Sequence, residues 1–64
     1  MTRHPNIRVN LASRNPYALI AAVREELRRA GVGREEIRQF SDEAFAETDP
    51  LGIQRVCRAW VALS

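Results

Sequence analysis

Few side chains in this sequence of 64 residues could carry out covalent chemistry. The only cysteine, Cys57, could act as a nucleophile if a neighbouring base removed its proton. The only histidine, His4, lies in residues 1–6, a segment that we expect to be a flexible tail. Cys57 also falls on the apolar face of a predicted helix, so we expect it to be buried in the core. We therefore predict no catalytic residue.

Metal ions and phosphate-bearing cofactors need groupings of side chains that this sequence does not contain. Its His, Cys and acidic residues do not occur at the spacing of metal ligands. Gly31 and Gly33 are typical of a turn between helices and not of a phosphate-binding loop. Asp42 and Glu43 are adjacent, so on a helix they point in different directions and do not form an acid-base pair. We predict no metal, no cofactor and no enzymatic activity.

Charge is the chemistry that remains, and it is separated along the chain. All ten basic residues are Arg, whose planar guanidinium can bind a carboxylate or a phosphate through two parallel hydrogen bonds. Residues 1–34 contain seven arginines and two glutamates, whereas residues 35–49 contain six acidic residues and one arginine. The chain therefore has a basic part and an acidic part, and binding through charge is the function class to examine.

The first candidate surface is an acidic row on the second predicted helix. Glu36, Glu43 and Glu47 share one side of that helix, with Asp42 next to them. We expect the row to lack a local counter-charge, because Arg38 lies on the other side of the helix. The row is either a solvated face or a docking surface for a basic partner, where complementary charge would speed association.

The second candidate surface is a basic stripe. Tyr17, Arg24 and Arg28 recur at i, i+7 and i+11 on the first predicted helix, and Arg55 and Arg58 follow in the third. An aromatic ring beside two arginines could stack on bases and bind phosphates. The alternative is a solvated face whose arginines pair with glutamates of the same helix. A helix-turn-helix reading is disfavoured, because its second helix would carry net negative charge toward DNA phosphates.

Three helices must position these groups. Asn15 is a favoured N-cap, Pro16 suits the first helical position, and Gly31 can take the left-handed conformation that ends a helix. A second helix follows Gly33. A third begins at Asp49-Pro50, and its apolar residues recur at i, i+3, i+4 and i+7. These residues are Ile53, Val56, Cys57 and Trp60. We expect Trp60 to anchor the core with Val23, Leu27 and Phe40.

The two ends of the chain carry strand patterns. Ile7, Val9 and Leu11 alternate with polar residues, which is typical of a half-buried strand. One strand alone is not stable, and its candidate partner is the segment 61–63. The alternative is that residues 61–63 continue the last helix. We predict a small α/β (α+β) domain at residues 7–64, of order β-α-α-α-β, with three helices packed on a two-stranded sheet.

Composition also bears on location. No apolar run approaches the 18 or so residues of a membrane span, and the first ten residues lack the apolar core of a signal peptide. A single cysteine agrees with a reducing compartment. The absence of Lys and the nine Ala indicate a GC-rich bacterial or phage genome. We expect a monomer in the cytoplasm of a bacterial host cell, with no membrane partner.

The order of helix-ending and core motifs resembles a group of short uncharacterised proteins found in bacterial, phage and prophage genomes. The motifs are Asn15-Pro16-Tyr17, Arg28-Arg29-Ala30-Gly31-Val32, Glu35-Glu36-Ile37, Phe40 and Trp60-Val61. Phage-borne proteins of this size include stoichiometric inhibitors of host defence, anti-CRISPR proteins among them. The resemblance therefore implies a non-catalytic inhibitor that binds a protein or ribonucleoprotein complex, for example a CRISPR effector complex. The alternative is a small nucleic-acid-binding transcriptional regulator that uses the arginine-rich face.

Overall fold

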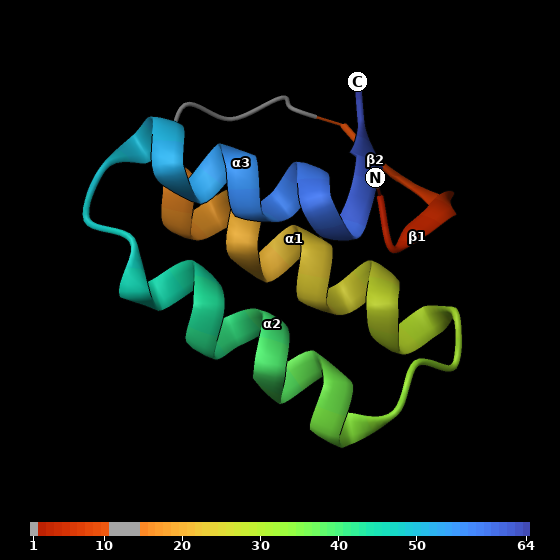
Figure 1. Ribbon diagram of the computed structural model, residues 1–64. Helices are drawn as coiled ribbons and strands as arrows, with labels where there is room; N and C mark the ends of the chain where they lie inside the picture. The colour runs from red at the N-terminus through yellow and green to blue at the C-terminus, as the bar shows by residue number, and fades with distance from the viewer. Residues whose placement is uncertain (1, 11–14) are drawn as a thin grey trace.

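The computed structural model describes residues 2–10 and 15–64, which form one small α+β domain (Figure 1). Its elements, in chain order, are β1 (His4–Val9), α1 (Pro16–Arg29), α2 (Arg34–Ala46), α3 (Pro50–Trp60) and β2 (Val61–Leu63). Each helix contacts the other two, and the two strands lie side by side at the end of the molecule where α3 finishes (Figure 1). This order confirms the predicted β-α-α-α-β arrangement.

Helix α1 begins and ends at the predicted residues. The Asn15 side chain accepts a 3.0 Å hydrogen bond from the backbone N–H of Tyr17, and Pro16 occupies the first helical position. After the helix, Gly31 has a φ of 83°, a left-handed conformation that costs glycine little. The N–H of Val32 then donates to the carbonyl of Leu27 at 3.0 Å, which satisfies a group that the helix end leaves unpaired.

The turn at residues 30–33 reverses the chain, so α1 and α2 run in opposite directions (Figure 1). Gly33 is the N-cap of α2 and supplies no side-chain hydrogen bond. The acidic residues Glu35 and Glu36 occupy the first turn, where the helix dipole favours negative charge. Asp49 caps α3 by accepting a 3.4 Å hydrogen bond from the N–H of Leu51.

The sheet consists of two parallel strands, and the three helices form the connection between them. Val61 follows Trp60 directly, so residues 61–63 are a strand and do not continue α3. The register pairs His4 with Val61 and Val9 with Leu63, with an irregularity between His4 and Arg8. Leu11, which the alternation added to the first strand, lies outside the described residues.

The predicted tail at residues 1–6 differs from the structure, because strand β1 already begins at His4. The Thr2 hydroxyl donates to the carbonyl of Arg58 at 3.0 Å, and the N–H of Arg3 donates to the carbonyl of Ala59 at 2.8 Å. These carbonyls belong to the last turn of α3, which leaves them without a partner inside the helix. Residues 2–6 have no apolar alternation, and contacts with the distant end of the chain hold them.

The core lies where the inner faces of all five elements meet. The predicted anchor Trp60 is 2% exposed, and Val23, Leu27 and Phe40 are fully buried around the same cluster. The Phe40 and Trp60 rings meet edge to face with their centroids 5.6 Å apart, a favourable aromatic geometry. Within residues 2–10 and 15–64, no helix has the length and apolar character needed to cross a membrane.

Candidate functional site

A groove of about 580 Å³ lies between α1 and α2, and the charged residues that line it are all arginines. Arg24 and Arg28 come from α1, and Arg34 and Arg38 come from α2. All four side chains are exposed. We call these four residues and the space between them the arginine groove.

The fold builds the groove from a repeated spacing. Arg24 and Arg28 lie at i and i+4 on α1, as Arg34 and Arg38 do on α2, so each pair occupies one side of its helix. Because the chain reverses at residues 30–33, the last turn of α1 lies beside the first turn of α2. Two pairs of arginines that are separate in the sequence therefore line one cavity.

The floor of the groove is largely apolar. Val32 and Ile37 are half-buried and line it together with Ser41, whose hydroxyl donates a 3.1 Å hydrogen bond to the carbonyl of Ile37. An anion in the groove would lie against this floor and exchange part of its water shell for the arginines. Charge-assisted hydrogen bonds gain strength where water is partly excluded.

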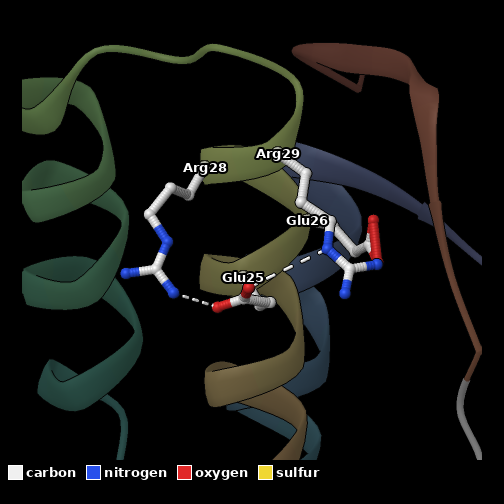
Figure 2. A network of polar contacts seen from close by, with 4 residues as sticks. All are labelled: Glu25, Glu26, Arg28 and Arg29. Carbon is white, nitrogen blue, oxygen red and sulfur yellow. Dashed lines mark hydrogen bonds and ion pairs between the residues drawn. The ribbon is translucent and has the colours of Figure 1, made fainter.

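Figure 2 shows the acidic residues of α1, Glu25 and Glu26, with the arginines that they contact. Arg28 extends toward α2 and donates a hydrogen bond to Glu25, whereas Arg29 and Glu26 lie on the side that faces β1 (Figure 2). Arg29 is 3.4 Å from Glu26 and 3.8 Å from Glu25. These pairs are exposed, and exposed pairs contribute only about 0 to 1 kcal/mol each.

The positive charge of the groove is therefore poorly balanced from within the protein. Glu25 is the only carboxylate among the described residues that contacts a groove arginine. Arg24, Arg34 and Arg38 have no acidic partner within residues 2–10 and 15–64. An anionic ligand could pair with these guanidinium groups without breaking an existing ion pair.

An exposed aromatic pair lies farther along the same side of the helical hairpin. The Tyr17 and Phe45 rings stack with centroids 6.1 Å apart and an interplanar angle of 20°. Their exposed fractions are 62% and 55%. Tyr17 precedes Arg24 by seven residues and Phe45 follows Arg38 by seven, and two helical turns return each helix to the same side.

The acidic row, by contrast, makes contacts within the protein. The expectation that the row lacks a counter-charge is wrong for Glu36, whose Oε2 pairs with Nε2 of His4 in β1 at 2.5 Å. Glu43 has no ion pair among the described residues, but its Oε1 accepts a 3.1 Å hydrogen bond from Nε1 of Trp60. The partners, His4 and Trp60, come from the two ends of the chain, so the sequence of α2 by itself does not indicate these contacts.

The remaining members of the row differ from each other. Glu47 lies over the first turn of α3, where a side chain at Gly52 would collide with its carboxylate. The N-terminal turn of a helix attracts negative charge, so this position suits a glutamate. Asp42 is exposed and contacts no other side chain among the described residues. Partner binding through the row stays a prediction.

The predicted basic stripe is partly assembled. Arg24 and Arg28 line the arginine groove, and Tyr17 belongs to the aromatic pair. Arg55 and Arg58 are exposed on α3 and do not line the groove. Three residues of this surface were missing from the predicted stripe: Arg34, Arg38 and Phe45. Arg38 and Phe45 are seven residues apart on α2, as Tyr17 and Arg24 are on α1. Only the packing of α2 on α1 places the two patterns side by side.

The single thiol, Cys57, belongs to the core and not to the exposed surface. Cys57 is fully buried, and burial raises its pKa from 9.0 to about 11, so it is a neutral thiol at neutral pH. Within residues 2–10 and 15–64, no three His, Cys, Asp or Glu side chains gather in a way that could hold a metal ion.

Comparison of the chain with protein-family models, curated proteins and solved structures finds no significant match. The geometry and charge of the arginine groove and its surroundings therefore provide the observations that bear on function.

Proposed function

We propose that this protein is a non-catalytic binding module that holds a nucleic acid by its phosphate groups in the arginine groove. The observation that carries this proposal is the meeting of four arginines from two helices, with one contacting carboxylate among the described residues. This function corresponds to the small nucleic-acid-binding regulator that the sequence leaves as the alternative. The arginine-rich face proposed here consists of Arg24 and Arg28 on α1 and of Arg34 and Arg38 on α2.

Phosphate chemistry suits these side chains. A guanidinium presents parallel N–H donors that match two phosphate oxygens, and it keeps its charge at every physiological pH. Nucleic-acid phosphates repeat along a strand, so several arginines can each meet one. Binding by three or four such contacts should weaken with salt, with a slope of log K against log salt of about −2 to −4.

The state of the acidic row supports the same choice. Glu36 and Glu43 are engaged with His4 and Trp60, so a basic partner would have to compete with contacts that hold the fold together. No such competition exists at Arg24, Arg34 and Arg38 in the described part of the chain. An anionic ligand therefore meets a surface that is more available than the one a cationic ligand would meet.

The test is a binding titration with a charge-reversed groove. Arg34→Glu with Arg38→Glu should weaken binding of a fluorescently labelled oligonucleotide by roughly tenfold or more per contact, since hydrogen bonds to charged groups contribute about 1.5 to 3 kcal/mol. The matched control is Arg55→Glu with Arg58→Glu, which changes the net charge equally but lies outside the groove. Equal losses in both variants would refute the groove as the binding site.

Stoichiometric inhibition of a host defence complex is a second candidate, favoured by the exposed carboxylate of Asp42 on α2. In that role Asp42 and Glu47 would dock on a basic surface of the complex. Asp42→Arg with Glu47→Arg should then abolish capture of a purified CRISPR effector complex by the tagged protein. Capture that instead depends on Arg34 and Arg38 would exclude the acidic row as the docking surface.

A further inference from the structure

We propose that the nucleic acid bound here is single-stranded and that its bases stack on Tyr17 and Phe45 while its phosphates lie in the arginine groove. This inference rests on the proposed function and names the class of ligand. Phosphate binding alone does not involve the two exposed rings of Tyr17 and Phe45, which lie near the arginine groove. The inference assigns them a function.

These two rings are largely outside the core. The core already contains Phe40 and Trp60, both with 2% exposure or less, and Tyr17 and Phe45 contribute little to it. Phe45 has no polar atom that would gain from contact with water. The two rings stack at an interplanar angle of 20°, one from α1 and one from α2, and each remains more than half exposed, so a base can still reach a ring.

The aromatic pair and the groove are at a distance that one strand can span. Seven residues separate Tyr17 from Arg24, and likewise Arg38 from Phe45, which corresponds to about 10 Å along each helix. A nucleic-acid strand advances about 3.4 Å per nucleotide when stacked, so a segment of about three nucleotides covers this distance. The groove lining extends toward the rings on both helices, because Ser41 lines the groove four residues before Phe45 and Ala21 lines the adjoining cavity four residues after Tyr17.

Stacking on exposed rings selects for unpaired bases. In a duplex the base faces are covered by their neighbours, whereas a single strand can place a base face on an aromatic side chain. Arginines next to aromatic rings form the combination that sequence-tolerant single-strand binders use, with phosphates on the cations and bases on the rings. An acidic peptide would satisfy the arginines but has no planar group for the rings.

The experiment compares three probes on the full chain: a labelled 12-nucleotide single strand, the same sequence as a duplex, and poly-glutamate. Tyr17→Ala with Phe45→Ala should weaken single-strand binding by roughly ten- to hundredfold, as expected for loss of one stacked base. Tyr17→Phe should retain binding, because it keeps the ring. Leu51→Ala is the matched control, since Leu51 is equally exposed at 60% but is not aromatic. Melting curves show that each variant is folded.

The outcomes distinguish failure of the stacking inference from failure of the proposed function. Full single-strand affinity in the double alanine variant, with loss in the Arg34/Arg38 reversal, overturns the stacking inference and leaves the proposed function in place. Duplex binding as tight as single-strand binding also overturns it. If the unmodified protein binds poly-glutamate and no nucleic acid at physiological salt, both proposals fail and the groove binds an acidic protein. Upfield shifts of base protons in NMR spectra of the complex would directly support stacking.

Discussion

Trp60 Nε1 donates a 3.1 Å hydrogen bond to Oε1 of Glu43, and this contact joins the end of α3 to α2. The indole is 2% exposed, so its N–H would lose its water partner on folding without this acceptor. His4 stacks on the same ring at 6.1 Å, and the Arg3 guanidinium lies 4.1 Å from its centroid. The tryptophan therefore brings together both ends of the chain and the centre of the acidic row.

Removing the Trp60 side chain should prevent folding. Trp60→Ala should cost about 3 to 5 kcal/mol, which is comparable to the whole stability of a domain this small. Trp60→Phe keeps a ring against Phe40 but loses the hydrogen bond to Glu43, so it should fold with reduced stability. Urea denaturation followed by circular dichroism measures both. A cooperative transition in Trp60→Ala at ordinary stability would show that the ring does not anchor the core.

Charge reversal on α2 should have unequal effects on stability. Glu43→Arg leaves the N–H of Trp60 without its acceptor and should cost about 1 to 3 kcal/mol. Asp42→Arg changes an exposed neighbour without such a contact and should stay within about 0.5 kcal/mol. Thermal melts of the two variants make the comparison. Equal melting temperatures would mean that the Trp60 hydrogen bond contributes nothing, and Glu43→Gln, which keeps an acceptor oxygen, is the conservative control.

Deletion of residues 1–6 should destabilise the protein, because Thr2 and Arg3 bond to the last turn of α3 and His4 contacts Glu36. A flexible tail would be removed without effect.

Amide hydrogen exchange gives an independent measurement: the N–H groups of Arg3 and Ser64, which donate to Ala59 and Val9, should be protected. Rapid exchange of the Ser64 N–H in a folded protein would contradict the pairing of β1 with β2, and rapid exchange of the Arg3 N–H would contradict the contact of the N-terminal segment with α3.

Stability should fall at high pH because of Cys57. Burial raises the pKa of its thiol from 9.0 to about 11, so above pH 9 an unfolded chain loses a proton that the folded protein keeps. The stabilisation is therefore complete below pH 9 and is lost as the pH rises through 11, at about 1.4 kcal/mol per pKa unit. Denaturant midpoints from pH 8 to 11 measure this decline. Cys57→Ala should show a shallower decline, and identical slopes would refute the assignment.

The helices could be predicted because their signals are local. Asn15 with Pro16, Gly31, and Asp49 with Pro50 mark helix ends through backbone geometry within a few residues of each position. Apolar spacing alone likewise predicts Trp60 on the inner face of α3, where it is 2% exposed. The buried position of Cys57 follows from the same periodicity. The pairing of residues 61–63 with the first strand is predicted from a different signal, the need of that strand for a partner, and the sequence leaves continuation of the last helix as the alternative.

Only the tertiary structure decided which charged and polar groups meet. Glu36 meets His4 across 32 positions and Glu43 meets Trp60 across 17, and no periodicity relates residues so far apart. The arginine groove depends on the same kind of fact. The sequence by itself determined that Arg24 and Arg28 share a side of one helix and that Arg34 and Arg38 share a side of the next. Burial of the apolar faces of α1 and α2 against each other and the core set the rotation of each helix, and that rotation placed all four arginines on one outer side.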